Sequence, residues 1–397
     1  MERRSRLVVK VGTGVLTGGG LELDEARMAD LARQIAAVRA EGQEVLLVSS
    51  GAIAAGRARL PLDRARRDIP TKQMLAAIGQ HRLMQVYDRL FTAHGIAVAQ
   101  TLLTKADLRD RQGYLNARNT LLGLLEHGVL PIINENDVVA VEEIHVGDHD
   151  RLFGENDNLA AMVANLVDAQ LLVNLTNTGG LFTADPRLDA AARLIPEVAR
   201  INRCIEQLAG GAGTHQGTGG MRTKIEAAKL ATASGITVVI APGVAPDVLP
   251  RLAAGEPIGT RFQPAANRRE SRQRWILSAL ASQTAVQVDA GAAEAIRHRG
   301  RSLLAAGVRA VQGRFGRGDP IAVLDPDSER IACGLANYAA ADVERIKGRH
   351  SQGIAATLGY AYGDEVIHRN NLVVLAHQEE GARAFAQRTR QSGRRRE

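Results

Sequence analysis

The sequence predicts an α/β protein: a mostly parallel open sheet with helices on both faces, followed by a small β-rich barrel domain. From residue 6 to about residue 260, short apolar runs typical of strands alternate with segments whose apolar residues recur at helical spacing. Beyond a polar, basic segment that begins near Phe262, short strand patterns follow one another with turns between them. A chain of 397 residues is also long enough for more than one core.

Strands and helices alternate throughout the first part. The predicted strands are Leu7–Val11, Val45–Ser49, Ile96–Thr101, Val129–Asn134, Leu171–Leu175 and Thr237–Ala241. The helices between them show apolar faces at Leu31, Ile35 and Val38, at Leu121, Leu124 and Leu125, and at Leu159, Met162, Val163 and Leu166. Because parallel strands need crossover connections, this alternation predicts a parallel sheet covered on both sides.

The second part is predicted to be β-rich, with only short helical pieces. Its strand candidates are Trp275–Leu277, Ala285–Val288, Arg309–Gln312, Ile321–Leu324 and Ile331–Leu335. We therefore place one domain at residues 1–267 and a second at 268–370. Residues 371–397 form a polar, basic tail that we expect to be disordered at its end.

Composition excludes several classes of protein. Aromatic residues make up only 3% of the chain, which is poor for a protein that stacks single-stranded bases. The net charge of +7 is concentrated at Arg268–Arg274 and Arg388–Arg396, which we interpret as solvated linker and tail, with nucleic-acid contact as the alternative. The two cysteines have no metal or disulfide spacing. No signal peptide or membrane span is visible, so we expect a cytoplasmic protein.

Lys10 ends the first apolar strand and is followed by Gly12 and Gly14. Burial of an unpaired lysine is costly, but it becomes favourable if an anion binds at that end of the sheet. The alternative is an edge lysine whose ammonium reaches solvent.

Three further strands also end in polar and small residues. These ends are Ser49-Ser50-Gly51-Ala52-Ile53, Asn134-Glu135-Asn136-Asp137, and Thr176-Asn177-Thr178-Gly179-Gly180. Each alone is compatible with ordinary turn chemistry, but together with Lys10 they predict one ligand site at the carboxyl edge of the sheet.

A glycine loop, Gly217-Thr218-Gly219-Gly220, opens a helix with Lys224 in its first turn. Backbone N–H groups, the helix dipole and the ammonium would converge on one point, and a phosphate suits that point. The Walker A spacing is absent, and an ordinary surface loop is the alternative. Two lysines and these N–H groups indicate phosphoryl transfer, which needs positioning and charge neutralisation rather than a covalent catalyst.

These segments resemble the glutamate 5-kinase branch of the amino acid kinase family. Leu181-Phe182-Thr183-Ala184-Asp185-Pro186 matches the nucleotide-side segment of that family, and the β-rich remainder resembles a PUA domain. The resemblance covers the chain to about residue 370 and implies the amino acid kinase fold. It also implies ATP-dependent phosphorylation of the L-glutamate γ-carboxylate to L-glutamyl 5-phosphate, the first step of proline biosynthesis. Mg²⁺ bound with ATP, oligomers and inhibition by proline are further implications.

The resemblance also implies roles for individual residues. Lys10, Lys224 and Asp157 would be catalytic, with Asp157 orienting the lysines. The substrate-binding set would be Ser50, Gly51, Asn134, Asp137 and Asn156. The nucleotide would contact Lys10, Thr176, Asn177, Thr218, Gly219, Gly220, Met221, Arg222, Thr223 and Lys224. Asn177 is a departure, because the family has aspartate there.

A second departure is an apparent insertion, which leaves two candidates for one family segment: Gly147-Asp148-His149-Asp150 and Gly154-Glu155-Asn156-Asp157-Asn158. We favour Asn156 and Asp157, because a helical pattern follows them immediately and would fix their direction.

Two other functions stay open from the sequence. One is a related kinase that acts on another carboxylate or carbamate. The other is an RNA-binding PUA protein with a degenerate kinase domain, which the complete set of catalytic-type residues argues against.

Overall fold

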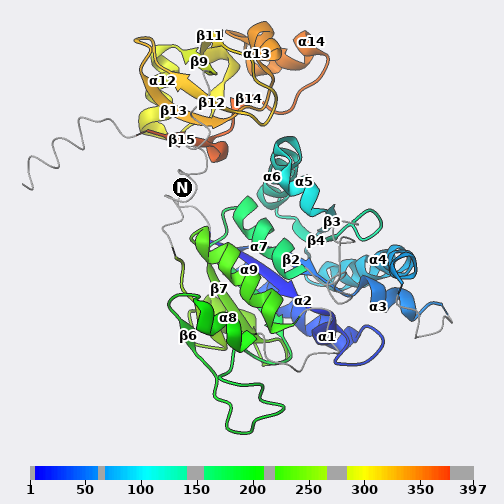
Figure 1. Ribbon diagram of the computed structural model, residues 1–397. Helices are drawn as coiled ribbons and strands as arrows, with labels where there is room; N and C mark the ends of the chain where they lie inside the picture. The colour runs from blue at the N-terminus through cyan, green and yellow to red at the C-terminus, as the bar shows by residue number, and fades with distance from the viewer. Residues whose placement is uncertain (1–4, 61–67, 141–155, 210–219, 266–283, 376–397) are drawn as a thin grey trace, which may run out of the picture. The chain divides into compact units, whose positions relative to one another are not determined.

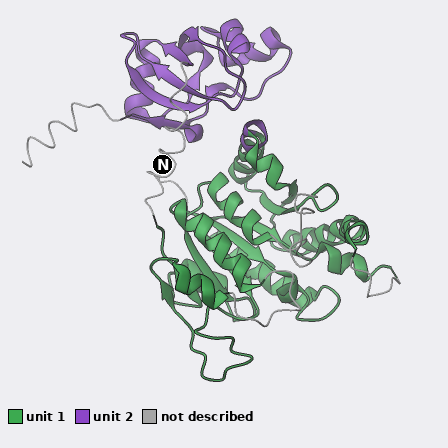
Figure 2. Cartoon of the chain, in the orientation of Figure 1, with its two compact units in different colours: residues 1–110, 116–271 green, residues 111–115, 272–397 purple. Residues whose placement is uncertain are grey.

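The computed structural model describes residues 5–60, 68–140, 156–209, 220–265 and 284–375. Contacts divide the chain into two compact units, residues 1–110 with 116–271, and residues 111–115 with 272–397 (Figure 2). The predicted boundary at 267/268 lies among residues that are not described and stays a prediction. Within the described residues, no helix has both the length and the apolar character needed to cross a bilayer.

An eight-stranded sheet forms the centre of the first unit, in the order β3-β4-β2-β1-β5-β7-β8-β6. Its strands are β1 (Arg6–Val11), β2 (Glu44–Ser49), β3 (Val98–Leu103), β4 (Leu130–Glu135), β5 (Leu171–Thr176), β6 (Glu197–Val198), β7 (Thr237–Pro242) and β8 (Thr260–Phe262). Neighbouring strands are parallel except β7 and β8. All six predicted strands are present, and the mostly parallel sheet is confirmed.

Helices cover both faces of this sheet (Figure 1). They are α1 (Thr13–Leu16), α2 (Glu25–Ala40), α3 (Ala52–Arg57), α4 (Ile69–Thr92), α5 (Lys105–Arg109), α6 (Arg111–Glu126), α7 (Asn156–Leu166), α8 (Arg203–Ala209), α9 (Met221–Ala233) and α10 (Val248–Ala253). Leu7, Val9 and Val11 of β1 share one apolar cluster with side chains of α2, α4 and α10. Because side chains alternate along a strand, Val8 and Lys10 face the other side, where α7 and α9 pack.

Two glycines bring α3 and α4 unusually close. A Cβ on Gly79 would lie 1.7 Å from the carbonyl oxygen of Ala52, and a Cβ on Gly56 would lie 2.0 Å from that of Leu75. Only glycine permits this approach, so α4 packs directly against the segment that follows β2.

The order of the strands places a switch point at β1. The chain runs from β1 to β2 on one side, whereas β5 pairs with β1 on the other side. In open α/β sheets, ligands bind at the carboxyl ends of strands at such a point. The polar ends of β2, β1 and β5 therefore meet where a ligand site is expected.

The second unit has its own core and sheet. Its elements are β9 (Ala285–Val288), α12 (Ala290–Arg299), β10 (Leu303–Leu304), η1 (Ala305–Gly307), β11 (Val308–Gln312), β12 (Pro320–Leu324), β13 (Arg330–Leu335), α13 (Ala340–Ile346), η2 (Ser351–Gly353), α14 (Ile354–Leu358), β14 (Glu365–Ile367), η3 (Arg369–Asn371) and β15 (Leu372–Val374). The main sheet has the order β11-β9-β12-β13-β15, and β10 pairs with β14. Four predicted strands are present, whereas Trp275–Leu277 lies outside the described residues. β15 lies beyond residue 370, where the domain was predicted to end, and it pairs with β13.

Candidate active site

Lys10 is buried, at 4% exposure, on an interior strand of the sheet. Its ammonium lies 2.5 Å from Oδ1 of Asp157, on the second residue of α7. The alternative of an edge lysine reaching solvent is therefore wrong, because β2 and β5 flank β1 on both sides.

Asp157 is fully buried and is held by four side chains from three elements. Its Oδ1 contacts Lys10 and accepts from Nδ2 of Asn174 on β5 at 2.8 Å. Its Oδ2 lies 3.1 Å from Nζ of Lys224 and accepts from Oγ1 of Thr223, both on α9, at 2.7 Å. This carboxylate thus joins β1, β5 and α9 to the start of α7.

This cluster has more positive than negative charge, since two buried lysines share one carboxylate. Burial opposes ionisation of Asp157, but the charges of Lys10 and Lys224 and hydrogen bonds from Lys10 and Thr223 outweigh it and hold its pKa well below the usual range. Burial lowers the pKa of Lys10; Asp157 opposes that shift and Lys224 adds to it. The three side chains carry an excess of one positive charge, so an anion would stabilise them.

The residues predicted to bind the nucleotide at the start of α9 differ in how deeply their side chains are buried. Gly220 precedes α9, and Met221 and Thr223 are half-buried in its first turn. Arg222 is exposed and pairs with Glu226 at 3.2 Å. Thr218 and Gly219 lie outside the described residues.

Thr176 and Asn177 lie at the end of β5. The Asn177 amide approaches the loop after β1 so closely that a Cβ on Gly14 would lie 2.8 Å from its Nδ2. These two residues therefore border the same carboxyl edge of the sheet as Lys10.

Three of the five residues predicted to bind glutamate form a hydrogen-bonded group. Nδ2 of Asn156, the first residue of α7, donates to Oγ of Ser50 at 3.0 Å and to Oδ1 of Asn134 at 2.9 Å. Gly51 adopts φ +108° between Ser50 and α3. The ends of β2 and β4 and the start of α7 are thus connected beside the Lys10–Asp157 pair.

Asp137, in the turn after β4, has no ion-pair or hydrogen-bond partner among the described residues. Burial raises the pKa of its carboxyl group to about 6. A cation from outside the chain would stabilise the ionised form of this buried carboxyl group, so Asp137 is suited to bind one.

Two residues of this network were not predicted from the sequence. Asn174 interrupts the apolar run of β5 and is 3% exposed. Gln80 on α4 accepts a hydrogen bond from Asn134 Nδ2 at 2.8 Å. The available signal was a polar residue on a buried face in each case.

The competing pair His149 and Asp150 lies outside the described residues. Asn156 and Asp157, by contrast, begin α7. Asn156 contacts the residues predicted to bind glutamate (the glutamate half-site), and Asp157 contacts those predicted to bind the nucleotide (the nucleotide half-site). The choice between the two pairs stays a prediction for kinetics to test.

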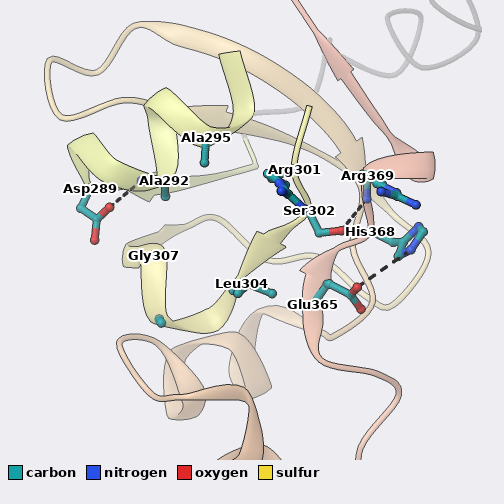
Figure 3. Close-up of a pocket in the computed structure, with 11 residues that line it drawn as sticks. Asp289, Ala292, Ala295, Arg301, Ser302, Leu304, Gly307, Glu365, His368 and Arg369 are labelled. Carbon is teal, nitrogen blue, oxygen red and sulfur yellow. Dashed lines mark hydrogen bonds and ion pairs between the residues drawn. The ribbon is translucent and has the colours of Figure 1, made fainter. Parts of the chain in front are cut away.

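A separate pocket of about 640 Å³ lies within the second unit (Figure 3). Arg301, His368 and Arg369 line it, together with the carboxylates of Asp289 and Glu365. It contains none of the residues predicted for catalysis.

Comparisons with known proteins agree with both units. The amino acid kinase family model matches residues 5–242, and the PUA domain model matches residues 284–358. Glutamate 5-kinase from Dehalococcoides mccartyi (strain CBDB1) is 55% identical over 370 residues, covering 93% of this chain and 98% of that protein. The Herpetosiphon aurantiacus glutamate 5-kinase is 56% identical at the same coverages. That of Deinococcus radiodurans is 52% identical, covering 93% and 100%.

Proposed function

Because the chain belongs to the glutamate 5-kinases of the amino acid kinase family, we propose that it transfers the γ-phosphoryl group of ATP to the γ-carboxylate of L-glutamate. The product is L-glutamyl 5-phosphate, and the reaction is the first step of proline biosynthesis. The observation that carries this proposal is the buried Lys10–Asp157–Lys224 cluster beside the amide group of Asn134 and Asn156.

The reaction needs charge stabilisation more than acid–base chemistry. An oxygen of the γ-carboxylate, which is already ionised at neutral pH, attacks the γ-phosphorus while the bond to the β–γ bridging oxygen breaks and ADP leaves. In our proposal Lys10 and Lys224 neutralise the oxygens of the phosphoryl group in transit. Asp157 fixes both ammonium groups in position, because each of its oxygens is already engaged by a lysine and a second donor.

Glutamate is assigned to the ends of β2 and β4. Its α-ammonium would pair with the Asp137 carboxylate, which has no partner in the described chain. Ser50, Gly51, Asn134 and Asn156 would hold its polar groups, since hydrogen bonds join Asn156 to Ser50 and to Asn134 at the end of the strand that Asp137 follows. The γ-carboxylate would then extend toward Lys10.

ATP is assigned to the side of β5 and α9. Thr176, Asn177 and the segment from Thr218 to Lys224 would contact it, with the α9 N-terminus directed at its phosphates. As in related kinases, we assign Mg²⁺ to the nucleotide phosphates, where it would reduce their negative charge.

Several properties that accompany this family are part of the proposal. We expect a cytoplasmic homo-oligomer that proline inhibits by feedback. RNA binding by the PUA domain would be a secondary property.

One coupled assay tests the proposal. Purified protein with ATP, Mg²⁺ and glutamate as the sole acceptor should release ADP, and hydroxylamine should trap the acyl phosphate as the hydroxamate. Aspartate and N-acetylglutamate serve as competing acceptors. ADP release without hydroxamate, or a preference for another acceptor, would contradict the assignment.

A further inference from the structure

Gln80 lies on α4, outside every segment assigned so far to substrates. It is 9% exposed and reaches the glutamate half-site through a single hydrogen bond, which its Oε1 accepts from Nδ2 of Asn134. Its helix packs closely beside the segment that follows β2, because Gly79 lets α4 approach the carbonyl of Ala52.

The backbone N–H of Glu135, which can only donate, fixes the direction of the Asn134 amide, and the bond to Gln80 holds its other end. Because Asn134 Nδ2 donates to Gln80, its Oδ1 faces the opposite way and accepts from Asn156 Nδ2 and from the backbone N–H of Glu135. An amide turned by 180° would exchange donor and acceptor and lose these bonds. Gln80, Asn134, Asn156 and Ser50 thus form one hydrogen-bonded chain with a defined direction.

That direction leaves one buried acceptor unsatisfied. Asn156 uses its Nδ2 for both Ser50 and Asn134, so its Oδ1 has no hydrogen-bond partner in the described chain. At the other end, Nε2 of Gln80 is likewise buried without a partner. Buried polar atoms without partners are costly, so this arrangement favours a ligand that can donate to Asn156.

We propose that Gln80 is a positioning residue for glutamate, which holds Asn134 and, through it, Asn156 in the orientation that presents Asn156 Oδ1 to the substrate's α-ammonium. This inference rests on the proposed glutamate kinase activity. Gln80 does not touch the substrate; it acts only through Asn134. The Lys10–Asp157–Lys224 cluster is not part of the chain, so ATP binding should be independent of Gln80.

Steady-state kinetics on Gln80→Met test the inference, because methionine keeps the length and shape of the side chain but lacks the amide oxygen that accepts the bond from Asn134. We expect the KM for glutamate to rise about tenfold, with the KM for ATP and kcat within about twofold of wild type. Gln85→Met, at an exposed position of the same helix, is the matched control. Gln80→Asn, which keeps the amide but is one methylene shorter, should give the same rise and covers the case in which Gln80→Met does not fold.

A double-mutant cycle with Asn134→Ala decides whether Gln80 acts through Asn134. The double variant should have the same glutamate KM as Asn134→Ala alone, since the partner through which Gln80 acts has been removed. Independent multiplication of the two KM effects, or an unchanged glutamate KM in both Gln80 variants, would overturn the inference. Absence of glutamate-dependent acyl phosphate in the wild type would instead contradict the proposed function itself.

Discussion

Two lysines from different elements share the single carboxylate of Asp157, and this arrangement makes their substitution informative. Lys10→Ala and Lys224→Ala should each lower kcat about 10²–10³-fold, with a smaller effect on the KM for glutamate, because in our proposal each removes a charge that acts on the moving phosphoryl group. Turnover by ADP release is the measurement. Lys229→Ala, on the exposed side of α9, is the control. Near-normal turnover in both variants would contradict the roles proposed for these lysines in phosphoryl transfer.

The pKa of about 6 at Asp137 predicts a pH-dependent affinity for glutamate. Protonated Asp137 cannot pair with an ammonium, so the KM for glutamate should rise about tenfold between pH 7 and pH 5 while the KM for ATP stays level. In Asp137→Asn the KM should be high at every pH in this range. A parallel rise for both substrates would indicate that another group titrates.

The same shift predicts the stability of the ligand-free protein. The folded state binds the Asp137 proton more tightly than the unfolded state, whose pKa is near 3.8, so this group destabilises the fold as pH rises from about 4 to about 6. Asp137→Asn should therefore melt at a higher temperature than wild type at pH 7 and at nearly the same temperature at pH 4. Differential scanning calorimetry without glutamate is the measurement, and a lower melting temperature at pH 7 would contradict it.

Sequence patterns anticipated side chains at strand ends and missed those in between. Lys10 and the polar residues after the strands could be assigned because the carboxyl ends of parallel strands meet at one edge. Asn174 contacts Asp157 because β5 pairs with β1 so that Asn174 lies opposite Lys10, and that register is set by tertiary pairing. Gln80 lies at helical spacing among buried residues, where an apolar pattern conceals it.

At the scale of elements, the close approach of α3 and α4 predicts a sensitive glycine. Gly79→Ala would place a methyl group 1.7 Å from the Ala52 carbonyl oxygen, so the helices must separate. We expect a lower melting temperature and a higher glutamate KM, because both Ser50 and Gln80 flank this contact. Gly123→Ala, with open space around its Cβ, is the control. Wild-type behaviour of Gly79→Ala would show that α4 does not position the half-site.

The start of α7 predicts which acidic residue is catalytic. Asp157→Asn should lose most activity, since two buried lysines would lose their common carboxylate. Asp150→Asn should keep most activity. Circular dichroism of both variants separates lost chemistry from lost folding. The reverse pattern of activities would mean that the inserted segment follows the site residues in the sequence rather than preceding them.

Element boundaries were displaced for a physical reason. The predicted strands at Ile96 and Val129 begin later, at Val98 and Leu130, because Ile96 N–H donates to Phe91 O and Val129 N–H to Leu124 O. These bonds close the ends of α4 and α6, so an apolar residue that resembles a strand start belongs to the helix terminus. The short strands β6 and β8 were not predicted, because two or three residues are too few to show the alternation of apolar and polar side chains that marks a strand.

At the scale of the molecule, two cores predict two separable parts. A chain truncated after residue 267 should fold and phosphorylate glutamate, because the first unit holds the eight-stranded sheet and all the residues assigned to catalysis. Solubility, a cooperative melt and hydroxamate formation are the measurements, with the full chain as reference. An insoluble or inactive fragment would mean that the PUA domain is required for the kinase domain to fold or work.

The fold class was predictable because alternating strands and helices have few compact solutions. The mixed strand order of the second sheet was not, since its short strands pair across long separations in sequence, as β15 does with β13. Its class could be assigned only from the change in pattern and from the resemblance to PUA domains.

The unequal charges around Asp157 have a consequence for handling the protein. We expect sulfate or phosphate ions from a buffer to bind in the place proposed for the transferred group, where they would balance the surplus positive charge. The same salts would then extend shelf life and compete with ATP. Preparations compared in different buffers would differ in both heat resistance and apparent nucleotide affinity, although the polypeptide is identical. A buffer without multivalent anions is therefore the sound reference for measurements on this enzyme.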